Sequence, residues 1–246
     1  MYRQEEKPLS SNDDHSAIKV ATVEEVPPVI EVDSIDGCNS SDEPGPSLNE
    51  AFGLADASPV ARKIIENYFG SKNKTPGGHC LKVSKSRFEK AYKEVHGHPF
   101  YEDLPKSMAT SYFSPEEVFD RLYASTSGGH QGWKSLPVTY RGKGNAGALV
   151  NANMGTLVDQ RGIWDGELRP GALMQVWRYE TDYKKVIHGT GDKDFDPLGH
   201  SFIFLGYERN KNGKIIGLKI ADQGYQSYRP ILRRDYEIWW AVNLSI

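Results

Sequence analysis

Residues 199–222 read GHSFIFLGYERNKNGKIIGLKIAD, two runs rich in β-branched and aromatic residues on either side of an Asn-Gly pair. Such runs are typical of β-strands, and Asn212-Gly213 between them is typical of a hairpin turn. His200 opens the first run, and Asp222 follows the second. Because a hairpin brings the start of one strand beside the end of the next, we expect the His200 and Asp222 side chains near one edge of an antiparallel sheet.

The rest of the chain places helices before strands. Further strands are predicted at 172–179 and 238–244, and helices at 58–70, 80–95, 114–123 and 148–160. Two helix starts are marked by local signals: Ser58 and Ser114 are each followed by a proline, and Glu117 completes a capping box. Helices followed by antiparallel strands predict an α+β domain with the helices packed on one face of the sheet.

Composition and charge divide the chain in two. It has 246 residues, 38% of them hydrophobic, and no apolar run long enough to cross a bilayer. Residues 1–50 hold three Lys or Arg and twelve Asp or Glu, a formal charge of −9; because the whole chain carries −3, the remainder carries +6. The N-terminal part has little apolar area to bury, which predicts a disordered acidic segment over 1–54 and a folded domain over 55–246. Whether this segment is an inert tail, a delivery signal or a mask for the basic domain stays open.

Cys80 has the surroundings of a nucleophile. It follows Gly77-Gly78 and opens a predicted helix, whose N-terminus stabilises a thiolate and presents free backbone N–H groups to an oxyanion. With His200 as general base and Asp222 as the carboxylate that orients it, the pattern predicts a cysteine hydrolase. Each residue also has a structural interpretation: a buried core cysteine, a histidine satisfied at a strand start, and an aspartate that caps a turn. The other cysteine, Cys38, lies in a Ser- and Pro-rich stretch, and we expect both thiols to be reduced.

Two segments resemble a known family. Residues 170–177 (PGALMQVW) and 199–206 (GHSFIFLG) are similar to the "PGDLVxF/W" and "GHVGIYLG" strands of NlpC/P60 and CHAP cysteine peptidases, and Cys80 occupies the place of their nucleophile. The resemblance implies a papain-like fold and hydrolysis of peptidoglycan amides by Cys80, His200 and Asp222, with no metal or cofactor. Ala172 replaces the family's Asp, and the interval from Cys80 to His200 is longer than usual, which implies an inserted lid or specificity region.

The segment 80–84 (CLKVS) is also similar to the cysteine-bearing helix of amidase effectors injected by bacterial type VI secretion. Because residues 1–20 lack the apolar stretch of a secretory signal, we expect a protein that is cytoplasmic in its producing cell and acts in the periplasm or cell wall after delivery. Phage lysins released by a holin fit equally well. Expected partners are peptidoglycan and, for an effector, a cognate immunity protein, with no nucleic acid and no membrane span; the protein is expected to be a monomer. His79, Gln175 and Tyr207 are candidates for contacting the substrate.

Other functions stay open from the sequence. The same thiol would serve a protease or deamidase acting on a host protein, whereas an inert Cys80 would fit a non-catalytic wall-binding module. Residues 142–147 match GxGxxG after a short predicted strand at 138–141, but no second parallel strand ending in an acidic residue follows.

Three further patterns suggest ligands. His96 and His98, with His188 or His200, offer zinc ligands without a fixed third one. Asp192, Asp194 and Asp196 alternate as in a calcium loop, but Pro197 stands where an EF-hand needs glycine. Trp239-Trp240 is expected to point to the two opposite faces of a strand.

Overall fold

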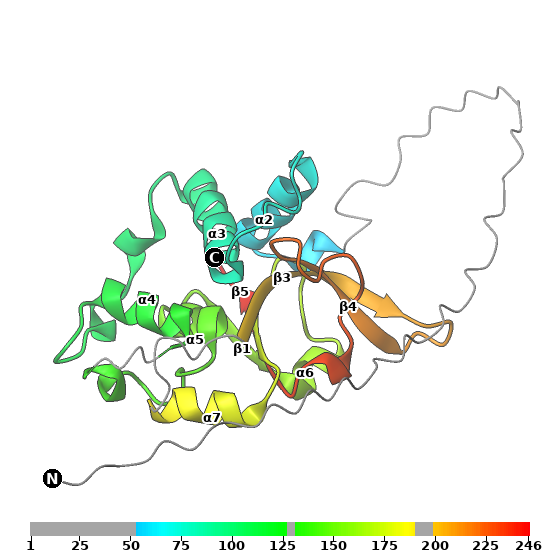
Figure 1. Cartoon of the computed structure of the whole chain (residues 1–246). Helices are drawn as coiled ribbons and strands as arrows, with labels where there is room; N and C mark the ends of the chain where they lie inside the picture. The colour runs from blue at the N-terminus through cyan, green and yellow to red at the C-terminus, as the bar shows by residue number, and fades with distance from the viewer. Residues whose placement is uncertain (1–52, 127–130, 190–198) are drawn as a thin grey trace, which may run out of the picture. The chain divides into compact units, whose positions relative to one another are not determined.

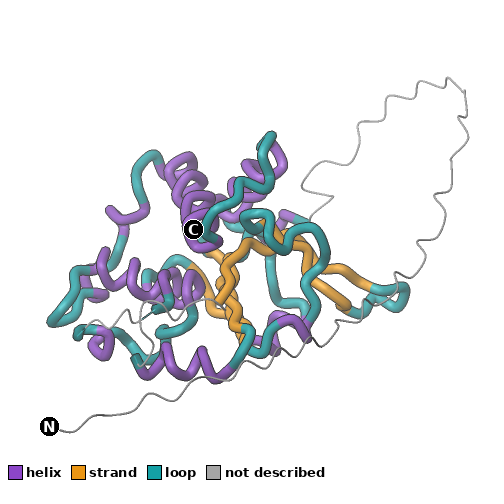
Figure 2. The backbone as a smooth tube through the Cα atoms, in the orientation of Figure 1, coloured by secondary structure: helices purple, strands orange, loops and turns teal. Residues whose placement is uncertain are grey.

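The computed structural model describes residues 53–126, 131–189 and 199–246. These residues form an α+β fold in which a five-stranded, fully antiparallel sheet has the strand order β1-β5-β2-β3-β4 (Figures 1 and 2). The helices are α2 (Pro59–Gly70), α3 (Cys80–His96), α4 (Pro115–Ala124), α5 (Gly144–Asn151), α6 (Gln160–Asp165) and α7 (Glu180–His188). The strands are β1 (Gly155–Asp159), β2 (Leu173–Trp177), β3 (Gly199–Arg209), β4 (Ile215–Ala221) and β5 (Ile238–Leu244). The predicted α+β class is confirmed, and the acidic segment lies almost wholly outside the described residues.

The sheet buries both of its faces. Leu173 and Val242 lie in a core that the helices α2 to α5 complete, whereas Val176 and Trp239 lie in a second core closed by α6 and the segment before β5. Alternation along a strand separates the two sets. Trp240 packs against the first core, so the two neighbouring tryptophans point to opposite faces, as predicted. Helices therefore cover mainly one face, but the other face is not left to solvent.

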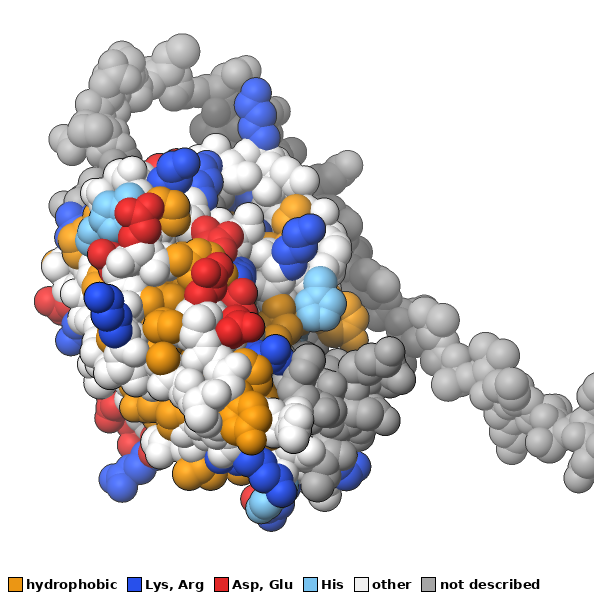
Figure 3. All heavy atoms as spheres, turned by 90° about the vertical axis from the view of Figure 1, so that its left-hand side faces the viewer, with side chains coloured by type: hydrophobic (Ala, Val, Ile, Leu, Met, Phe, Trp, Pro, Cys, Tyr) orange, Lys and Arg blue, Asp and Glu red, His pale blue; other side chains and the backbone are white. Residues whose placement is uncertain are grey.

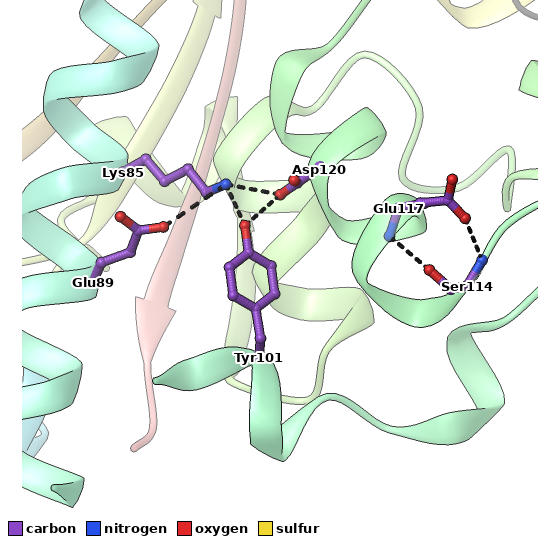
Figure 4. Close-up of polar contacts among 6 residues, drawn as sticks. All are labelled: Lys85, Glu89, Tyr101, Ser114, Glu117 and Asp120. Atoms are coloured by element: carbon purple, nitrogen blue, oxygen red, sulfur yellow. Dashed lines mark hydrogen bonds and ion pairs between the residues drawn. The ribbon is translucent and has the colours of Figure 1, made fainter. Parts of the chain in front are cut away.

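Local sequence signals place most elements correctly. The two strands of the predicted hairpin and those predicted at 172–179 and 238–244 are present, and Gly213 takes a φ of +78° in the turn between β3 and β4. The Ser58 hydroxyl accepts from the Ala61 N–H at the start of α2, and Ser114 and Glu117 form a complete capping box at the start of α4 (Figure 4). These caps satisfy helix N–H groups that would otherwise lack partners.

Two predicted elements are wrong. Residues 138–141 form turns instead of a strand, and the helix predicted over 148–160 ends at Asn151 and is followed by β1 and α6. The helix ends because Asn153 adopts a left-handed φ of +59°. Gly155 then lets β1 approach β5 closely, since a Cβ there would lie 2.5 Å from the Asn243 carbonyl oxygen. Pairing with the C-terminal strand thus overrides the local helical pattern.

A polar cluster joins α3 to α4 and to the 3-10 helix η2 (Phe100–Asp103). Lys85 Nζ donates to the Tyr101 hydroxyl and to Asp120 Oδ1 at 2.8 Å, and the Tyr101 hydroxyl also donates to Asp120 at 2.8 Å (Figure 4). We call these three residues the Lys85 clamp. Acidic side chains gather beside apolar ones on the side of the molecule seen in Figure 3, with Lys and Arg side chains around them.

Candidate active site

Cys80 is the first residue of α3 and is half-buried. The two glycines before it adopt left-handed φ values of +73° and +79°, which glycine tolerates best, and the loop enters the helix through His79 at the N-cap. Among the residues that the structure describes, the N-cap side chain, His79, makes no capping hydrogen bond to this helix. The backbone N–H groups of the first turn are therefore left for a ligand or for the sulfur itself. Cys38 lies outside the described residues.

His200 and Asp222 are paired and buried. His200 Nε2 donates to Asp222 Oδ2 at 3.1 Å, and the two residues are 6% and 1% exposed. The hairpin explains the pairing, because Ile203 of β3 lies opposite Ala221 of β4 and so brings the two strand ends together. The contact predicted from the order of the two residues in the sequence is confirmed.

The Asp222 carboxylate is held as an anion. Burial alone raises its pKa, but hydrogen bonds from His200, from the Gly224 and Gln226 N–H groups, each at 2.7 Å, and from the Ser227 side chain outweigh burial. The pKa of Asp222 is consequently far below its usual range. A carboxylate that stays charged is suited to hold one imidazole tautomer and to stabilise the imidazolium.

The His200 ring connects Asp222 to Cys80. Burial lowers the pKa of His200, but hydrogen bonds with Asp222 and with Cys80, together with their negative charges, raise it overall. Since Nε2 faces the carboxylate, Nδ1 is the ring nitrogen available to the sulfur. The structure thus brings together the thiol, imidazole and carboxylate that the sequence analysis selected.

Arg87 connects the two loops beside the thiol and the carboxylate, and its role was not predicted from the sequence. It lies seven residues after Cys80 on α3, and its guanidinium donates to the backbone carbonyls of Asp222 and Lys74, each at 3.0 Å. The Gly77 N–H also donates to the Gln223 carbonyl at 2.8 Å. The loop that precedes the nucleophile is therefore tied to the loop that follows the carboxylate. An arginine two helical turns from Cys80, on the same helix face, was the available signal.

The predicted substrate-contacting residues are dispersed. His79 is exposed beside Cys80. Gln175 is 3% exposed and accepts from the Ser201 hydroxyl, on the opposite sheet face from His200 because it pairs with the next residue along β3. Tyr207 lies at the far end of β3, where its hydroxyl donates to the Ile163 carbonyl and accepts from the Leu168 N–H, each at 2.9 Å. The structure does not bring Gln175 or Tyr207 to the thiol.

The glycine motif at 142–147 is explained by packing. The Trp177 indole donates to the Gly142 carbonyl at 2.7 Å, and the Gly144 N–H donates to the Ser125 hydroxyl at 2.8 Å. A Cβ on Gly144 would lie 2.3 Å from Gln175 Oε1. Since residues 131–143, directly before this helix, contain no strand, the context that a dinucleotide site requires is missing.

The possible metal ligands do not assemble. In the part of the chain that the structure describes, no group of three or more His, Cys, Asp or Glu residues is placed to hold a metal ion. His96 stacks on Tyr92, and His188 Nδ1 contacts the Lys184 carbonyl at 2.7 Å. Residues 192–197, with the alternating aspartates, lie outside the described residues.

No protein-family model matches the chain, and no curated protein or solved structure shows significant similarity to it. None of the helices described is long and apolar enough to cross a membrane.

Proposed function

We propose that the protein is a cysteine hydrolase of papain-like architecture. One observation carries the proposal: a buried imidazole is hydrogen-bonded to a charged carboxylate and also lies close enough to the half-buried thiol at a helix N-terminus for the two groups to interact. A histidine with a purely structural role needs only hydrogen-bond partners for its ring nitrogens. His200 instead lies between a carboxylate acceptor and a potential nucleophile. Cys80 is the nucleophile, His200 the acid–base, and Asp222 the residue that orients His200.

The arrangement supports a two-stage acyl transfer. The Cys80 thiolate attacks an amide carbonyl, a C–S bond forms, and the resulting oxyanion lies near the free N–H groups of the α3 N-terminus. The C–N bond then breaks as the His200 imidazolium gives its proton to the leaving amine. In the second stage His200 takes a proton from water, the hydroxide attacks the thioester, and the acid and the thiol are released.

The substrate we propose is the stem peptide of bacterial peptidoglycan, cleaved by an effector-like or lysin-like amidase or endopeptidase. The similarity of residues 170–177 and 199–206 to strands of NlpC/P60 and CHAP peptidases supports this choice. The order of the elements supports it as well, because the nucleophile helix precedes the strand that carries the histidine. Action in the periplasm or cell wall, and inhibition by an immunity protein in the producing cell, belong to the same proposal.

Mass spectrometry of muropeptides tests the proposal. Purified peptidoglycan is incubated with the wild type, with Cys80→Ala and with a clamp variant, Asp120→Ala, as a folded control. We expect new free amines with the wild type and the control, and a loss of more than about a thousandfold with Cys80→Ala. Cleavage that survives Cys80→Ala would refute the proposal. Ammonia released from glutamine-rich protein, with intact peptidoglycan, would assign a deamidase instead.

A further inference from the structure

The loop after β4 holds an exposed aromatic ring against the buried imidazole of His200. The Tyr225 ring centroid lies 6.0 Å from that of His200, with an angle of 79° between the planes, yet Tyr225 is 60% exposed. Part of the Tyr225 ring therefore packs on a buried imidazole, while much of the ring faces solvent. Tyr228, three residues further, is 76% exposed.

The backbone on either side of Tyr225 is held in place by hydrogen bonds and packing. The N–H groups of Gly224 and Gln226 both donate to the Asp222 carboxylate at 2.7 Å. The Gln226 side chain is buried and accepts from the Tyr236 hydroxyl at 2.6 Å. Gly224 packs on Thr75, where a Cβ would come within 2.8 Å of the Thr75 Cβ. The carboxylate that orients His200 thus also positions Tyr225.

A fixed, exposed tyrosine is a good contact for a ligand because little conformational entropy is lost when it binds. Single exposed aromatic residues are common and need no explanation. Tyr112 is similarly exposed, at 56%, but its ring lies beside Phe113, away from the candidate site. Tyr225 differs because its ring contacts His200, the imidazole that interacts with the thiol.

We infer that Tyr225 is a substrate-contacting, specificity-determining residue whose ring binds a C–H-bearing face of the group next to the scissile amide. The inference rests on the proposed function. A carbonyl within attacking distance of Cys80, roughly 3–3.5 Å, is also close to His200, so the groups flanking that carbonyl come near the ring that contacts His200. The negative face of an aromatic ring attracts C–H groups, which both a sugar ring and an aliphatic side chain present.

The test compares kinetics on two substrates: a disaccharide muropeptide and the same stem peptide without its sugars. For Tyr225→Ala we expect KM to rise about three- to tenfold with kcat little changed, because binding is lost equally in the ground and transition states. Tyr225→Phe should behave like the wild type. Tyr112→Ala is the matched control and should leave both constants unchanged. A KM effect confined to the muropeptide assigns a sugar ring, and an equal effect on both substrates assigns a peptide side chain.

The alkylation rate of Cys80 by iodoacetamide separates binding from damage to the site, and it should stay within about twofold of the wild type in Tyr225→Ala. A fall in kcat together with slower alkylation would show that Tyr225 acts on His200, which overturns the inference. An unchanged KM in an active enzyme overturns the inference alone. A wild type that cleaves neither substrate overturns the proposed function and the inference with it.

Discussion

Two polar clusters share the helix α3 and differ in burial. The Lys85 clamp joins α3 to α4 through side chains that are 24% exposed for Lys85 and 46% exposed for Asp120. The His200–Asp222 pair has side chains that are 8% and 0% exposed, and it reaches Cys80 at the first residue of the same helix. One cluster fastens two helices at the surface, while the other buries charge beside a reactive atom.

The difference matters because burial changes what a charge costs. An ion pair in solvent contributes little, since water solvates the partners almost as well when they are apart. A buried carboxylate left without its partners pays a large desolvation penalty, so it persists only where several donors hold it. Two backbone N–H groups and the His200 ring donate such hydrogen bonds to Asp222. This buried charge, close to a thiol at the start of a helix, supports the proposed active site.

Removing one carboxylate from each cluster gives the largest expected contrast. Asp222→Ala should lower the free energy of unfolding by about 3–5 kcal/mol, because it leaves His200 and two N–H groups buried without an acceptor. Asp120→Ala should cost less than about 1 kcal/mol. Urea denaturation of both variants measures the contrast. Equal losses would show that the two clusters do not differ as their burial indicates.

Alkylation of the two thiols sharpens the comparison further. Cys80 should react with iodoacetamide near neutral pH about tenfold or more faster than Cys38, because the His200 imidazole beside it can accept the thiol proton. His200→Ala should slow Cys80, whereas Asp120→Ala should not. Mass spectrometry of peptides after short labelling times reports each site separately. Equal rates at both thiols would count against an activated nucleophile.

The two clusters should also respond differently to pH. The pKa of His200 is raised, so its stabilising contribution is complete below the unfolded pKa of about 6.5 and is lost as the pH rises through the folded pKa. The difference in unfolding free energy between the wild type and His200→Gln should therefore shrink from pH 6 to pH 9, by up to about 1.4 kcal/mol per pH unit.

The clamp and the carboxylate act as internal controls for that measurement. The pKa of Lys85 is raised above 10.5, so its contribution is constant from pH 6 to pH 9. The pKa of Asp222 is lowered, so its contribution is present above about pH 4 and is lost only in acid. A difference between the wild type and Asp120→Asn that shrinks as steeply as that of His200→Gln would remove the distinction between the clusters.

Prediction from sequence succeeded where the signal was local. Ser58 and Ser114 cap their helices, and Asn212-Gly213 turns the hairpin, because each depends on atoms within about four residues along the chain. It failed for β1, whose five residues pair with the C-terminal strand against a helical pattern. It also misjudged Gln175, since only the pairing of β2 with β3 tells which face a side chain takes.

The sequence by itself determined the α+β class, the start of α3 at Cys80 and the adjacency of His200 and Asp222. These follow from turn, cap and alternation rules that operate over short stretches of chain. The tertiary structure alone decided that the thiol meets the imidazole, that Arg87 ties the two flanking loops together, and that Tyr225 stays exposed against His200. Those contacts join segments far apart in the chain, and their geometry is set by packing of the whole core, which no local pattern records.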